Sequence, residues 1–302
     1  MTSTPNVDAA PHERAGLALG FVGVASFSLT LPMARIALGA LDPVQVAVWR
    51  GIVAAVAALL ILLAARPPLP KGGDWGRLCL CALGVVFGFP FFSTLAMATV
   101  SAAHGAVVVG LLPLATAVAG AVVGGERPSK AFWLMSLIGT ALTLTFVLRQ
   151  AGGALAPGHA YLLAAVAAAA IGYAYGGLLA RTLGGWQVSC WTLVVALPAL
   201  AVLGLFIPPV PLSTPPHALA AFLYLALVSQ LSGFFAWYRG MALAGIARVS
   251  QLQLLQLFMT LLAAWLLLGE AVGAEVLVFG TLVAATVRVG TGLRVGAAPN
   301  GR

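Results

Sequence analysis

Two stretches of the chain share one design and decide its fold: residues 103–127, AHGAVVVGLLPLATAVAGAVVGGER, and residues 247–270, ARVSQLQLLQLFMTLLAAWLLLGE. Each is a long apolar run that ends in Gly-Glu, at Glu126 and at Glu270. A helix of about 20 apolar residues is needed to cross the hydrocarbon core of a bilayer. The two stretches therefore predict two membrane-spanning helices in equivalent places of a duplicated chain.

The composition of the whole chain agrees with a membrane protein. Of the 302 residues, 62% are hydrophobic and 7% are charged, and the mean hydropathy is +1.07. Soluble domains carry about 25% charged residues. The net charge of +8 comes from bases that stand singly between apolar runs, without the basic stripe that nucleic-acid binding needs. We therefore expect lipid as a partner and no nucleic acid.

Apolar runs long enough to span a bilayer recur along the sequence, and Pro- and Gly-rich turns separate them. They predict an all-α integral membrane protein with ten transmembrane helices, over residues 16–38, 44–65, 76–98, 102–123, 131–148, 158–180, 188–207, 218–238, 250–268 and 272–289. The first run is too long for a signal peptide and lacks a cleavage site, so it is expected to be retained.

The distribution of Lys and Arg predicts how these helices are oriented, because cytoplasmic loops carry an excess of bases. Both termini are expected in the cytoplasm, at a bacterial-type inner membrane. With the N-terminus inside, most of the bases lie on the cytoplasmic side: Arg14, Arg66, Lys71, Arg77, Arg127, Lys130, Arg181, Arg239, Arg248, Arg288, Arg294 and Arg302.

The second half of the chain repeats the first at an offset of 144 residues. The matches pair Phe91 with Phe235, Met97 with Met241, Thr116 with Thr260, and Glu126 with Glu270. Because each half has five predicted spans, an odd number, the second half would insert upside down. The expected organisation is a cytoplasmic tail over residues 1–15, a first repeat over 16–150, a second repeat over 151–290 and a cytoplasmic tail over 291–302. A duplicated scaffold without transport is the alternative.

Two inverted five-span halves, each with Gly-Glu after its fourth span, resemble the EamA family of the drug/metabolite transporter superfamily. Arg50 in the second span also fits this family. The runs 234–240, FFAWYRG, and 249–256, VSQLQLLQ, are most similar to the YddG-type amino-acid exporters. One departure is Leu257, where the first half has Pro113.

The resemblance implies a secondary transporter. Its cargo would be small amphiphilic metabolites, above all amino acids and aromatic ones among them, moved outward across the inner membrane by alternating access. No Asp or Glu lies in the middle of a predicted span, where ion-driven carriers commonly place one. We therefore expect facilitated transport without ion coupling. Carriers of drugs, sugars or nucleotide sugars, or a membrane enzyme that acts on lipid, are the alternatives.

The sequence contains no catalytic constellation, nucleotide loop or metal-ligand spacing, so no enzyme, cofactor or metal is expected. The cysteines lie in or beside apolar runs, so we interpret them as packing residues. The sequence does not determine the oligomeric state.

Polar and aromatic side chains at helical spacing predict a binding cavity with apolar walls and few hydrogen-bonding groups. The alternative is that the amides join neighbouring helices. The candidate substrate-binding residues are Phe91, His104, Gln230, Phe234, Trp237, Gln253, Gln256 and Thr260.

Four charged residues in or near the predicted spans are candidates for a specific role. Arg35 and Arg50 flank an outer turn and would attract a solute carboxylate to an outer mouth; alternatively, they extend toward lipid headgroups. Glu126 and Glu270 each follow one helix and precede the next. We expect them to be structural caps of the following helix, because a carboxylate there accepts hydrogen bonds from free N–H groups.

Overall fold

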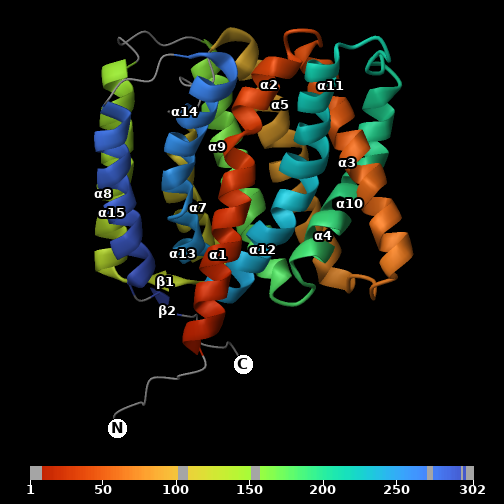
Figure 1. Cartoon of the computed structure of the whole chain (residues 1–302). Helices are drawn as coiled ribbons and strands as arrows, with labels where there is room; N and C mark the ends of the chain where they lie inside the picture. The colour runs from red at the N-terminus through yellow and green to blue at the C-terminus, as the bar shows by residue number, and fades with distance from the viewer. Residues whose placement is uncertain (1–8, 101–107, 151–156, 271–274, 294, 297–302) are drawn as a thin grey trace.

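The computed structural model describes residues 9–100, 108–150, 157–270, 275–293 and 295–296. Helices stand side by side along one direction, and the start of α1 and the strands β1 and β2 lie at the same end (Figure 1). In order, the elements are α1 (Ala9–Ser28), α2 (Thr30–Ala37), α3 (Pro43–Ala65), α4 (Gly72–Ala82), η1 (Leu83–Gly88), α5 (Phe89–Thr99), α7 (Leu112–Val123), β1 (Arg127–Pro128), α8 (Lys130–Gln150), α9 (Pro157–Ala180), α10 (Gly185–Gly204), α11 (Pro216–Leu223), η2 (Tyr224–Ser232), α12 (Gly233–Ala244), α13 (Ile246–Ser250), α14 (Gln253–Leu268), α15 (Glu275–Gly292) and β2 (Val295–Gly296).

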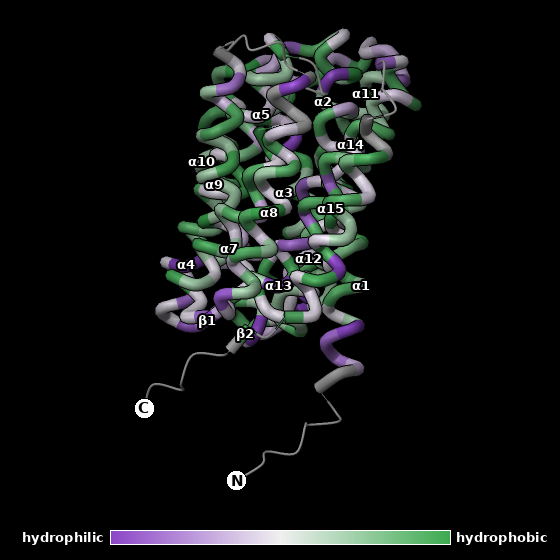
Figure 2. The backbone as a smooth tube through the Cα atoms, turned by 90° about the vertical axis from the view of Figure 1, so that its left-hand side faces the viewer, coloured by the Kyte–Doolittle hydropathy of each residue, from purple (hydrophilic) through white to green (hydrophobic). Residues whose placement is uncertain are grey.

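The length and apolarity of these helices make the chain a multi-pass membrane protein. Among the described residues, seven helices are long and apolar enough to cross a bilayer, and three shorter apolar helices cover Leu112–Val123, Lys130–Thr145 and Val278–Gly292. Hydrophobic residues dominate the middle of the helices, and the start of α1 is hydrophilic (Figure 2). The sequence did not predict the short antiparallel pair β1–β2, which joins Arg127 to Gly296 and Pro128 to Val295.

Several helices that cross the bundle are interrupted at mid-length. Pro32 cannot donate a backbone hydrogen bond to the carbonyl of Ser28, and α1 ends there. Thr260 Oγ1 donates to this carbonyl instead, at 2.8 Å. The segments η1 and η2 are π-helical, and such turns are frequent at functional sites. The interruptions therefore leave backbone carbonyls that polar side chains of other helices satisfy.

Close packing joins the two halves of the chain. α1 packs against α12, and α9 packs against α5, α4 and η1; α3 pairs with α10, and α8 with α15. Small residues permit the approach of α1 and α12, since a Cβ on Gly240 would lie 2.7 Å from the carbonyl oxygen of Gly16. The halves are thus interleaved, and helices from both of them surround the centre of the bundle.

Candidate functional site

A narrow cavity lies at the centre of the bundle, between helices of the two halves. The space among its lining side chains, including the part open to solvent, is about 320 Å³, and its free interior has room for about one water molecule. The residues that line it come from α1, α2, α3, η1, α5, α9, η2, α12 and α14: Phe27, Thr30, Arg50, Val85, Phe89, Pro90, Tyr173, Ser229, Gln230, Phe234 and Gln256.

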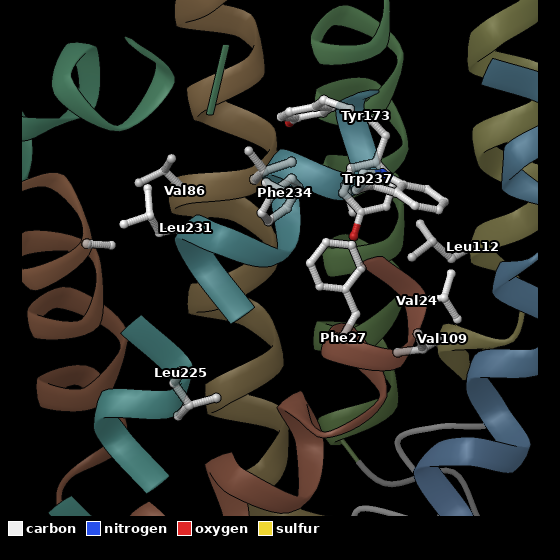
Figure 3. Close-up of a cluster of buried hydrophobic side chains, with 14 of the residues drawn as sticks. Val24, Phe27, Val86, Val109, Leu112, Tyr173, Leu225, Leu231, Phe234 and Trp237 are labelled. Carbon is white, nitrogen blue, oxygen red and sulfur yellow. The ribbon is translucent and has the colours of Figure 1, made fainter. Parts of the chain in front are cut away.

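One wall of the cavity is aromatic. The ring centroids of Phe27 and Phe234 are 4.8 Å apart, and those of Tyr173 and Phe234 are 5.8 Å apart. Trp237 packs edge-on against Phe27 and Tyr173, at 5.9 and 5.5 Å, and is completely buried. Figure 3 shows these four rings gathered from α1, α9 and α12. Such a wall favours an apolar or aromatic group of a solute.

The other wall is polar and incompletely hydrogen-bonded. Thr30 Oγ1 and Ser229 Oγ are 2.7 Å apart, and Arg50 Nη2 donates to Ser229 Oγ at 3.3 Å. Gln230 Nε2 donates to the carbonyl of Val85 at 3.3 Å. Four buried atoms of these lining residues have no partner in the described part of the chain: Arg50 Nε and Nη1, Gln230 Oε1 and Gln256 Oε1. Unpaired buried polar atoms are costly, so these groups are available to a ligand.

The structure brings three of the predicted substrate-binding residues together at this cavity: Gln230, Phe234 and Gln256. Trp237 lies behind the aromatic wall. Gln253 is buried on α14 outside the lining, and neither of its amide atoms has a partner among the described residues.

The remaining predicted substrate-binding residues are elsewhere. Thr260 bonds the carbonyl of Ser28, which gives it a structural partner. Phe91 is 38% exposed and lines a separate apolar groove with Leu200 and Leu203 on α10. His104 lies outside the described residues.

The two arginines of the predicted outer mouth occupy different environments. Arg35 is tied to the backbone, since its Nη1 donates to the carbonyl of Met97 at 2.8 Å. Arg50 is only 2% exposed and reaches the central cavity, deeper than the sequence suggested. Arg50 therefore belongs to the polar wall and not to a mouth.

Sequence reasoning missed several lining residues: Phe27, Thr30, Phe89, Tyr173 and Ser229. There was only a weak indication in the sequence that Thr30 and Ser229 line a cavity: Thr30 is close to Pro32, and Ser229 precedes Gln230. Single hydroxyls and aromatic rings are common inside apolar helices, so nothing local separates a lining residue from a packing residue.

Glu126 forms a second polar cluster, at the end of the bundle where α1 begins. Its Oε1 accepts from Ile246 N at 2.8 Å and from Arg181 Nη2 at 2.6 Å, and its Oε2 accepts from Ala247 N at 2.7 Å. It therefore caps α13 in the second half, whereas the sequence suggested the helix that follows it, α8. Every oxygen of this buried carboxylate has a partner.

The two Gly-Glu turns have the same backbone geometry. Gly125 and Gly269 both have a φ of 65°, and the backbone N–H groups of Glu126 and Glu270 both reach back to carbonyls six residues earlier, at 3.4 Å. The left-handed conformation explains the glycine in each turn. This local equivalence agrees with the repeat seen in the sequence.

Comparisons with known proteins agree with this geometry. The model of the EamA-like transporter family matches residues 14–148 and again residues 156–289. The chain is 46% identical over 255 residues to the uncharacterized transporter YdeK of Bacillus subtilis (strain 168). The aligned region covers 84% of this chain and 89% of that protein. A protein of known crystal structure shares the fold with a TM-score of 0.72 and 21% identity, over 91% of this chain and 98% of that chain. Because the family model covers most of the sequence, the chain belongs to the EamA-like transporter family, within the drug/metabolite transporter superfamily.

Proposed function

We propose that this transporter moves small amphiphilic metabolites, above all amino acids and aromatic ones among them, outward across a bacterial-type inner membrane. The observation that carries the proposal is the central cavity, which aromatic rings line together with amide, hydroxyl and guanidinium groups. A solute with an apolar side chain and a polar head matches these two walls.

The proposed mechanism is alternating access, in which two inverted five-helix repeats rock around the cavity. The contacts between halves support it, because α1 packs against α12 while its repeat counterpart α9 packs against α5, the counterpart of α12. The double match to the family model supports the duplication. In this arrangement ten helices span the membrane, both termini are cytoplasmic, and Glu126 and Glu270 lie on opposite sides.

The proposed transport is facilitated, driven by the gradient of the solute itself. None of the described residues that line the cavity is an Asp or Glu, the groups that most often bind a coupling proton or cation in carriers. Solute exchange across liposomes should therefore proceed without an imposed pH or sodium gradient.

Counterflow of a radiolabelled amino acid in proteoliposomes tests the proposal. We expect exchange without ATP or an ion gradient, and we expect Gln256→Leu to lower its rate about tenfold, because one amide contact to the solute is lost. Phe91→Leu is the matched control, since Phe91 lies in the separate groove and its replacement should leave the rate unchanged.

Three outcomes would reassign the function. Counterflow of drugs or of nucleotide sugars without amino-acid exchange would favour the other carriers of the superfamily. Turnover of lipid without any solute exchange would favour a membrane enzyme. Full activity of Gln256→Leu together with loss of activity in Phe91→Leu would move the site from the cavity to the groove.

A further inference from the structure

We infer that Arg50 is the binding group for a carboxylate of the solute, so that the site selects small organic acids with an apolar tail, whether or not they carry an amino group. This inference rests on the proposed function and specifies its substrate class. It starts from the one charged residue among the described residues that line the cavity.

The charge of Arg50 is isolated. A guanidinium has five N–H donors and stays protonated in proteins. Here the described chain supplies one acceptor, Ser229 Oγ at 3.3 Å, and leaves Nε and Nη1 without any. No carboxylate of the described residues lies within ion-pair distance of it.

An isolated buried cation is unfavourable, and a bound anion removes that penalty. Burial takes the guanidinium out of water, and only a partner charge with good hydrogen bonds compensates for the loss. The same low-polarity surroundings strengthen its attraction for an anion. Arg50 thus makes the empty cavity costly and the anion-filled cavity favourable, which is the behaviour expected of a binding group.

The chemistry of the cavity points to a carboxylate. A carboxylate is planar, carries one charge and matches the donor geometry of a guanidinium. The hydroxyl of Ser229 accepts from Arg50 and lies 2.7 Å from that of Thr30, and the rings of Phe27 and Phe234 line the same cavity. A solute with one charged group and an apolar tail would contact both kinds of side chain once alternating access widens this narrow cavity.

The amino group of an amino acid has no such partner. The acceptors without a partner along the described lining are neutral, Gln230 Oε1 and Gln256 Oε1. Hydrogen bonds to a charged group contribute more when the partner is charged as well. Recognition should therefore depend strongly on the carboxylate of the solute and weakly on its ammonium group.

Competition in the phenylalanine counterflow assay tests this difference. We expect phenylpyruvate and 3-phenylpropionate to inhibit within about threefold of unlabelled phenylalanine, and phenylethylamine and phenylalanine amide to inhibit at least about 30-fold more weakly. Arg50→Met should abolish exchange. Arg239→Met is the matched control, because it removes an exposed arginine away from the cavity and should leave the inhibition series unchanged.

A binding measurement separates failure of this inference from failure of the proposed function. In chloride-free buffer, 3-phenylpropionate should raise the thermal midpoint of the purified wild-type protein but not of Arg50→Met, even if no amino-acid exchange is detected. Equal inhibition by acids and amines, or exchange and acid-induced stabilisation that persist in Arg50→Met, would overturn the inference. An Arg50-dependent shift that chloride produces as strongly as 3-phenylpropionate would also overturn it, in favour of a halide site.

Discussion

Glu126 and Arg50 are both buried charges, yet their surroundings are opposite. The Glu126 carboxylate accepts two backbone N–H bonds and one guanidinium bond, so both of its oxygens are satisfied. The Arg50 guanidinium has a single hydroxyl partner and two nitrogens without an acceptor in the described chain. Glu126 thus joins the two halves of the chain, whereas Arg50 lies in the cavity between them.

The comparison contrasts a buried charge whose hydrogen bonds are complete with one whose hydrogen bonds are not. A charge whose hydrogen bonds are all made within the protein contributes to the folded state, and its removal leaves other groups unpaired. A charge without partners lowers stability. Substitution of Glu126 should therefore mainly lower the free energy of unfolding, whereas substitution of Arg50 should mainly lower transport.

The largest effect on stability is expected for Glu126→Ala. It leaves the N–H groups of Ile246 and Ala247 unpaired, and the loss should be about 3 kcal/mol of unfolding free energy, with little from Arg181 because that side chain is partly exposed. Reversible unfolding in mixed micelles measures it. Arg181→Gln is the control and should cost less than about 1 kcal/mol. Equal stability of Glu126→Ala and wild type would contradict the structural role.

Gly245→Ala tests the same cluster through the backbone. Gly245 precedes α13 with φ 90° and ψ 148°, a conformation that is almost restricted to glycine, and a Cβ there would lie 3.4 Å from Glu126 Oε1. We expect a loss of about 2 kcal/mol. Gly269→Ala is the milder comparison, since its φ of 65° is left-handed helical and a Cβ meets nothing within 4 Å. A larger loss at Gly269 would contradict this ranking by backbone conformation.

The smallest effect on stability is expected for Arg50→Met, although this variant should lose transport. Replacement of an unpaired buried charge by an apolar side chain of similar length should leave the unfolding free energy unchanged or raise it by up to about 1 kcal/mol. The same unfolding assay, without solute, measures it. A loss of several kcal/mol, comparable to that of Glu126→Ala, would mean that Arg50 has a structural partner after all.

Much of the architecture could be predicted from local sequence features. Length and apolarity located the helices, because crossing a bilayer requires a continuous apolar run whatever its neighbours are. The Gly-Glu turns could be paired because a left-handed residue at a helix end requires glycine locally. The amide-bearing Gln230 and Gln256 and the ring of Phe234 could be selected as lining residues because polar and aromatic groups stand out within apolar helices.

The remaining features depended on contacts between distant segments. In an apolar chain, helix faces toward lipid and toward the core have similar composition, so periodicity does not show which way Phe91 or Arg50 points. The partners of Glu126 are 120 and 121 residues away, and Thr260 bonds a carbonyl 232 residues away. The sequence by itself determined that the chain forms helices long and apolar enough to cross a bilayer, of which the described residues contain seven. Only the tertiary structure decided which buried charge has all of its hydrogen bonds within the described chain and which lacks partners there, because hydrogen-bond satisfaction depends on groups that folding brings together.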